Sequence, residues 1–336
     1  MDYYEFKDTL KKTIENEFKD CTVTEECVSR INSKMTDAFK VLSNNSNAGI
    51  YYDIESAYED YTYNNSFKDI LHTCKIEIAS EIDNLNNNTE IIKKFLTGES
   101  FDSLIKSGNV ILQVINFNKN KEYLDDIYYR IQGDVAIIPT ILPKLPKSET
   151  DVMNISIPIN KKMFDLLNRN NESVDLIFDK LLDTTFKTSN YYIRILNFDG
   201  CKDLSLDAAL EEYEKIHLTT SIISVNNSTN YLGANCILYP EIFEKFANIT
   251  ESNIYILPSS RHEVIIMDSN IADKEELHHI VKATNQYELS EKDFLSDNVY
   301  MYNIKTKQIE MVTGKNMELE LKNNTLKQNT NTIKGR

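Results

Sequence analysis

One stretch, Gly233 to Met267, constrains the fold more than any other part of the chain. Its sequence is GANCILYPEIFEKFANITESNIYILPSSRHEVIIM. Apolar runs flank one amphipathic run, which predicts a strand, a helix, a strand, a turn and a strand in that order. Pro240 stands where the helix begins, a position that proline tolerates. The stretch therefore predicts strands and helices mixed within one unit.

The N-terminal part predicts a helix followed by a small antiparallel meander. Apolar residues recur every three or four positions from Tyr3 to Phe18, so we expect a helix that ends near Asp20. Ser66 and Asp69 resemble a capping box at the start of a second long helix. That helix should end at a polar break, Asn84 to Asn88, which is the predicted domain boundary.

The larger part predicts a buried sheet with further helices. The run from Asn109 to Asn116 is almost wholly apolar, as expected of a strand buried on both faces. Pro139 should confine its strand to an edge or a bulge. Ile155 to Ile159 leads into a helix at Lys161, as Cys236 to Tyr239 does after Gly233. The fold class is therefore α+β, with mixed sheets and packed helices. The predicted units are a small N-terminal helix-plus-meander unit (1–88), a larger α+β unit (89–314) and a basic disordered tail (315–336).

Charge limits the partners that we expect. The 336 residues carry a formal net charge of −15. The tail from Lys315 has five basic and two acidic residues, so the preceding body carries −18. Such a body should repel nucleic-acid phosphate and anionic membranes, so we expect neither direct nucleic-acid binding nor membrane binding. An acidic surface favours solubility, and it could also imitate DNA in order to inhibit a nucleic-acid-binding protein.

Cysteine use and the N-terminus both indicate a reducing compartment. The five cysteines have no CxxC spacing, which argues against a disulfide framework and a zinc ribbon. Cys74 and Cys236 lie in apolar runs and are expected to be buried. The first residues lack the apolar core of a signal peptide, and no apolar run is long enough to span a bilayer. We expect a soluble bacterial cytoplasmic protein without cofactor or metal.

The turn before the last strand of the opening stretch gathers the candidate site residues. His262, Glu263, Ser259 and Ser260 are the catalytic candidates, and Arg261 and Tyr239 are candidate binding residues. Neighbours on an extended chain point to opposite faces, so His262 and Glu263 should not reach one substrate without a bend. The Gly-x-Ser-x-Gly and His-Glu-x-x-His spacings are absent. The alternative is structural: the serines bond the turn and Arg261 pairs with a carboxylate.

A second segment, Asp53 to Tyr63, is acidic and rich in tyrosine. Tyrosine is a frequent interface anchor, so this segment could bind a basic partner. The alternative is a solvated connector whose rings lie against the fold.

Three groups of residues resemble an uncharacterised family. They are Gly233-Ala234-x-Cys236-Ile237-Leu238-Tyr239-Pro240, Tyr255-Ile256-Leu257-Pro258-Ser259-Ser260-x-His262-Glu263-Val264, and Leu295-Ser296-Asp297-x-Val299-Tyr300-x-Tyr302. The chain is similar in these to a domain of unknown function from Gram-positive gut bacteria, often encoded on mobile elements. The resemblance implies an α+β fold and intracellular placement, and it implies no reaction.

Three hypotheses about function follow. The leading one is a non-catalytic interaction or regulatory protein with a protein partner, encoded on a mobile element. The second is an enzyme or small-ligand binder that uses the turn from Ser259 to Glu263. The third is an acidic DNA mimic.

Overall fold

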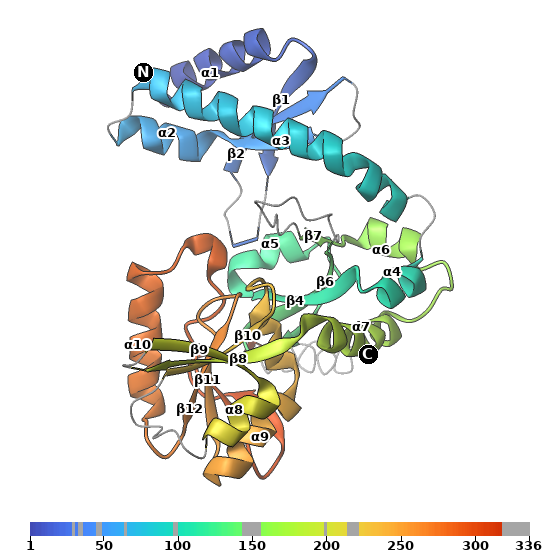
Figure 1. The fold of residues 1–336 in the computed structure, drawn as a ribbon. Coiled ribbons are helices and arrows are strands. Elements are labelled where there is room, and N and C mark those ends of the chain that lie inside the picture. Colours follow the sequence, from blue (N-terminus) through green and yellow to red (C-terminus); the bar gives the residue numbers. More distant parts are fainter. Residues whose placement is uncertain are drawn as a thin grey trace, which may run out of the picture. The chain divides into compact units, whose positions relative to one another are not determined.

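The computed structural model describes residues 1–28, 31–32, 36–44, 49–63, 66–96, 100–142, 156–197, 200–213 and 222–317. The chain forms two compact units. Unit 1 comprises residues 1–99 with 145–151, and unit 2 comprises 100–144 with 152–336. Helices and antiparallel sheets occur in both (Figure 1), so the predicted α+β class is confirmed. The predicted tail lies outside the described residues from 318 on.

Unit 1 is a helix followed by a meander and two more helices, which confirms the predicted helix-plus-meander. Its elements are α1 (Tyr3–Glu17), β1 (Cys21–Val28), β2 (Thr36–Ser43), β3 (Gly49–Asp53), α2 (Ile54–Thr62) and α3 (Phe67–Leu96). The sheet has the antiparallel order β1-β2-β3. The helices and the sheet share one apolar core that includes Phe6, Leu10, Ile14, Val41, Ile54, Cys74 and Ile78.

Helix α3 begins as predicted and continues further than predicted. The Ser66 hydroxyl oxygen accepts from the Asp69 amide at 3.2 Å, and the Ser66 amide donates to the Asp69 carboxylate at 3.2 Å, which is a capping box. The predicted break from Asn84 to Asn88 is wrong, because the α3 backbone remains helical through it to Leu96. Asparagine is a weak helix former, yet its cost of a few tenths of a kcal/mol per residue is small enough to be overridden by its context.

The first sheet of unit 2 contains the most deeply buried strands. It follows α4 (Phe101–Ser107) and contains β4 (Val110–Asn116), β5 (Arg130–Gln132), β6 (Val135–Ile141) and β7 (Ile157–Pro158). The order is β4-β6-β5, and β7 also pairs with β6. Every residue of β4 and β6 is buried, so the prediction for Asn109 to Asn116 is confirmed. Short helices η1 (Asn118–Asn120) and α5 (Lys121–Leu124) precede β5, and α6 (Lys161–Leu167) and α7 (Val174–Ser189) follow β7.

The prediction that Pro139 marks an edge or a bulge is wrong, because β6 has partners on both sides. Pro139 lies opposite Leu112, whose own backbone groups bond away from β6, to Thr185 and Asn235. The pair is therefore a non-hydrogen-bonded one, and the proline nitrogen faces the other side of the strand. On that side β5 has ended, and the pairing that includes β7 ends at Pro139, whose carbonyl accepts from the Ile159 amide at 2.9 Å. The missing N–H therefore removes only the last, reciprocal bond of this pairing.

The second sheet of unit 2 has seven antiparallel strands. The order is β14-β13-β11-β12-β10-β8-β9. The strands are β8 (Tyr191–Asn197), β9 (Gly200–Ser205), β10 (Ile222–Asn227), β11 (Ile254–Leu257), β12 (Val264–Asp268), β13 (Tyr300–Asn303) and β14 (Gln308–Met311). Helix α10 (Lys274–Tyr287) packs on this sheet through Leu277 and Val281. Helices α8 (Leu206–Tyr213) and α9 (Pro240–Thr250) pack against each other, and α9 contacts β11 and β13 (Figure 1).

The segment Gly233–Leu238 is a 3-10 helix, η3, so the strand predicted from Cys236 to Tyr239 is wrong. Strand β10 already has β12 and β8 as neighbours, which leaves no position for another strand beside it. All six residues of η3 are buried. The apolar run correctly indicates that the segment is buried. It does not indicate a strand, because periodicity cannot distinguish a short buried helix from a strand. The similarity to Ile155 to Ile159 is therefore limited to the helix that follows each segment.

Asn235 of η3 completes the outer edge of β4. Its amide nitrogen donates to the Leu112 carbonyl at 2.7 Å, and its oxygen accepts from the Val114 amide at 3.0 Å. The Leu112 amide donates to the Thr185 hydroxyl at 2.8 Å. A buried strand edge needs such partners, since an unsatisfied backbone group costs about 1–3 kcal/mol.

We therefore expect Asn235→Ala to destabilise the protein by about 2–4 kcal/mol, because two buried backbone groups lose their partner. Urea unfolding followed by circular dichroism measures this change. Gln286→Ala removes an exposed amide from α10 of the same unit and should stay within about 0.5 kcal/mol of the wild type. Equal effects of the two substitutions would contradict the role given to Asn235.

Candidate functional site

The turn that carries the candidate residues lies between β11 and β12 and is bonded along its length to a second segment. Ser260 forms a β-bridge with Phe294. Backbone bonds on either side extend this pairing: Arg261 N to Asp293 O at 2.9 Å, Leu295 N to Ser259 O at 2.8 Å, and Ser296 N to Pro258 O at 3.0 Å. The turn is thus paired with the segment that leads into β13.

Both ring nitrogens of His262 have partners within the fold. Its Nε2 lies 2.9 Å from Asp293 Oδ1, and the Leu232 amide donates to its Nδ1 at 3.4 Å. A backbone amide can only donate, so Nδ1 accepts and the ring proton belongs on Nε2, where it is donated to Asp293. The ring also lies 5.4 Å from that of Tyr231, centroid to centroid. His262 could act as a base through Nδ1 only by giving up the Leu232 bond.

Glu263 has a different partner from His262. Its Oε2 accepts from the Ser224 hydroxyl of β10 at 2.9 Å. This arrangement follows the alternation of side chains along an extended chain. The turn therefore holds a histidine–aspartate pair and a separate serine–glutamate pair.

The other candidates also bond to the fold. The Ser260 hydroxyl accepts from the His262 amide at 3.0 Å, and Ser259 contributes its carbonyl to the pairing described above. The Nε of Arg261 is 3.6 Å from Asp293 Oδ1, which is close enough for an ion pair and too far for a hydrogen bond. Tyr239 is 3% exposed, and its hydroxyl donates to the Leu182 carbonyl at 2.8 Å. Burial raises the pKa of this phenol well above its ordinary value.

Gly233 shows how closely two of the motif segments pack. A Cβ at Gly233 would lie 2.3 Å from the His262 carbonyl oxygen and 2.5 Å from Asn226 Oδ1. The Ala234 amide also donates to the Arg261 carbonyl, at 3.3 Å. The first motif segment therefore packs directly against the turn that belongs to the second motif segment.

The structure adds a buried polar group that the sequence did not reveal. We call it the Asp134 cluster: Asp134 at the turn between β5 and β6, and Ser296, Asn298 and Tyr300 at the start of β13. The Ser296 hydroxyl donates to Asp134 Oδ2 at 2.8 Å, Asn298 Nδ2 donates to the same oxygen at 2.9 Å, and the Tyr300 hydroxyl bonds Oδ1. Asp134 is 4% exposed and Tyr300 is fully buried. The cluster joins the two sheets of unit 2.

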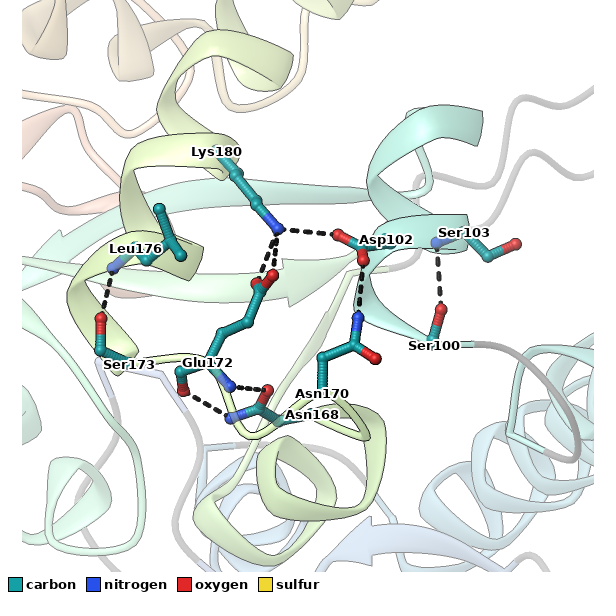
Figure 2. Close-up of polar contacts among 9 residues, drawn as sticks. All are labelled: Ser100, Asp102, Ser103, Asn168, Asn170, Glu172, Ser173, Leu176 and Lys180. Carbon is teal, nitrogen blue, oxygen red and sulfur yellow. Dashed lines mark hydrogen bonds and ion pairs between the residues drawn. The ribbon is translucent and has the colours of Figure 1, made fainter.

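A further polar cluster surrounds Lys180 of α7 (Figure 2). Its ammonium group lies 2.6 Å from Glu172 Oε1 and 2.9 Å from Asp102 Oδ1 of α4, while Asn170 donates to the other Asp102 oxygen at 2.9 Å. The Glu172 carboxylate, followed by that of Asp102, raises the pKa of Lys180, and Lys180 lowers the pKa of Asp102. These ion pairs connect α4, α7 and the loop before α7.

Within the described residues no group of three or more His, Cys, Asp or Glu side chains has an arrangement that could hold a metal ion. The described helices also include none that is long and apolar enough to cross a membrane. All five cysteines are free thiols, and Cys74 and Cys236 are buried as predicted.

These features can now be compared with known proteins. The chain matches a family of unknown function (DUF5688) over residues 3–304, and it belongs to that family. The match includes almost all of unit 1 and all three motif segments that carry the resemblance. Comparisons with curated proteins and with solved structures give no match. The family thus supplies no reaction against which to test the turn.

The pair His262–Asp293 provides a test of the turn. If it holds the turn against the segment before β13, a double-mutant cycle of His262→Ala and Asp293→Ala should give a coupling energy of about 1 kcal/mol or more. Urea unfolding of the wild type, both single variants and the double variant measures it. Additive effects would show that the pair contributes no stability.

Proposed function

We propose that this protein acts by binding a protein partner with a basic surface, without catalysis at the turn from Ser259 to Glu263. The observation that carries the proposal is the orientation of α2. Its Tyr58 and Tyr61 rings face inward, each 5.2 Å from the ring of Phe6, while Glu55, Glu59 and Asp60 are exposed. Helix α2 therefore presents carboxylates outward on a rigid support.

The sequence around α2 carries only negative charges. From Val41 to Phe67 there are four acidic residues and no Lys, Arg or His. Glu55 and Glu59 take part in none of the ion pairs formed among the described residues. An acidic surface of this kind accelerates encounter with a basic partner and discriminates against acidic ones.

The bonds of the candidate turn support the non-catalytic part of the proposal. His262 and Glu263 bond other parts of unit 2, and the Ser260 hydroxyl bonds the turn backbone, as in the structural alternative considered for this turn. A bacterial regulatory role and an origin on a mobile element belong to the same proposal and rest on the family resemblance alone.

The proposal predicts a partner whose capture depends on α2. The double reversal Glu55→Lys/Glu59→Lys should reduce capture of a cross-linked partner from lysate of the encoding organism at least tenfold. The partner is identified by mass spectrometry and then purified and titrated. Raising the ionic strength from about 0.1 M to about 1 M should weaken binding, since the Debye length falls from about 10 Å to about 3 Å.

The matched control reverses Glu275 and Glu276, two exposed residues of α10, and should leave the affinity within about threefold. Equal loss in both variants would show that only the total charge matters. Competition by DNA for the captured partner would favour the DNA mimic. A folded Glu263→Gln variant that loses a cellular activity while it keeps the partner would favour an enzyme or ligand binder.

A further inference from the structure

The geometry of the Asp134 cluster restricts where its hydroxyl and carboxyl protons can lie. The Tyr300 hydroxyl lies near the Asp134 amide at 3.0 Å, the Gln132 carbonyl at 3.1 Å, Asp134 Oδ1 and the Val135 amide. The two amides can only donate to it, and the Gln132 carbonyl can only accept from it. The hydroxyl has one proton, so it cannot donate to both the carbonyl and a carboxylate.

A proton on Asp134 Oδ1 removes this conflict. The carboxyl then donates to the Tyr300 hydroxyl, which donates to the Gln132 carbonyl and still accepts from the Asp134 amide. Asp134 Oδ2 remains an acceptor for Ser296 and Asn298. Both Asp134 oxygens, the Tyr300 hydroxyl and the Gln132 carbonyl then have a partner of the correct kind.

Charges nearby do not compensate an ionised Asp134. Among the described residues the carboxyl contacts one titratable group, the Tyr300 phenol, and no cation pairs with it. Charged residues on the adjoining segments have other partners: Asp297 accepts from Asn285 at 2.8 Å, Lys119 pairs with Glu291 at 3.0 Å, and Arg130 pairs with Asp175 and Asp179. A buried charge without a counter-charge is costly, and such groups tend to neutralise.

We propose that Asp134 is protonated in the folded protein at neutral pH, and that its ionisation at higher pH loosens the junction between the two sheets of unit 2. The junction then acts as a pH-sensitive connection within the fold. The Gly133 backbone beside it has little freedom to adjust, because a Cβ there would lie 2.5 Å from the Tyr300 hydroxyl oxygen.

The pKa of Asp134 agrees in direction. Burial raises it above the ordinary value of 3.8, and this outweighs the opposite effect of the hydrogen bonds from Tyr300, Ser296 and Asn298. An acid whose folded pKa is raised binds more protons in the folded than in the unfolded state. Its contribution to stability is therefore greatest at low pH and is lost as the pH rises from the unfolded pKa through the folded pKa.

The test compares the unfolding constants of the wild type and Asp134→Asn from pH 5 to pH 8. The difference between them cancels the other titrating groups. An asparagine amide can donate to Tyr300 and its carbonyl can accept from Ser296 and Asn298, so the variant should fold. The ratio of the wild-type to the variant unfolding constant should rise by up to about tenfold per pH unit. A ratio that stays flat from pH 5 to pH 7 would overturn the proposal.

A matched variant and a second measurement complete the test. Asp126→Asn changes an exposed aspartate of the same unit and should give a flat ratio over this range. The second measurement is the infrared carbonyl band of a protonated carboxyl in the folded wild type at pH 7, with isotope-labelled aspartate. It does not require the variant to fold. Its presence supports a protonated Asp134, and its absence overturns it.

Discussion

The buried edge of β4 and the buried turn after β5 impose one requirement on unit 2. Polar groups that cannot reach water must be bonded by side chains from other elements of the unit. Asn235 and Thr185 meet it at β4, and the Asp134 cluster meets it at the turn. Asn116 adds a third connection, because its amide donates to the Leu295 carbonyl at 2.8 Å. Each bond adds little net stability by itself, yet leaving its groups unpaired would cost about 1–3 kcal/mol. Specific residues at these positions are therefore required for the two sheets to pack.

This requirement accounts for the motif segments without assigning them chemistry. Gly233 allows η3 to approach the turn, His262 holds the turn against Asp293, and Ser296 and Tyr300 hold the β5–β6 turn. The three segments meet in one part of unit 2. The first bonds β4 through Asn235 and the third bonds the β5–β6 turn, so both connect the two sheets, while the second pairs with the segment before β13.

The sequence predicted the parts of the fold that depend on local pattern. The cap at Ser66, the buried strand at β4 and the meander of unit 1 all follow from spacing or composition. The failures concern context. Pro139 is tolerated in β6 because β5 ends before it, and η3 is helical because β10 has no free side. Neither fact is visible in a local window.

The candidate site shows the same division. Alternation along the chain correctly predicted that the side chains of His262 and Glu263 point in different directions. It could not predict their partners, Asp293 and Ser224, because these come from distant segments. Asp134 gave no signal, since a single aspartate after a glycine is typical of a hairpin turn. Only the fold reveals that it is buried beneath Tyr300.

Native-state hydrogen exchange tests most directly whether buried polar side chains make the two sheets one cooperative unit. The informative amides are those of Val114 in β4, Asp134 at the β5–β6 turn and Ile256 in β11. The account predicts one common free energy of exchange for all three, equal to that of global unfolding of unit 2. Clearly separate values for Val114 and Ile256 would show that the sheets open independently, and they would contradict it.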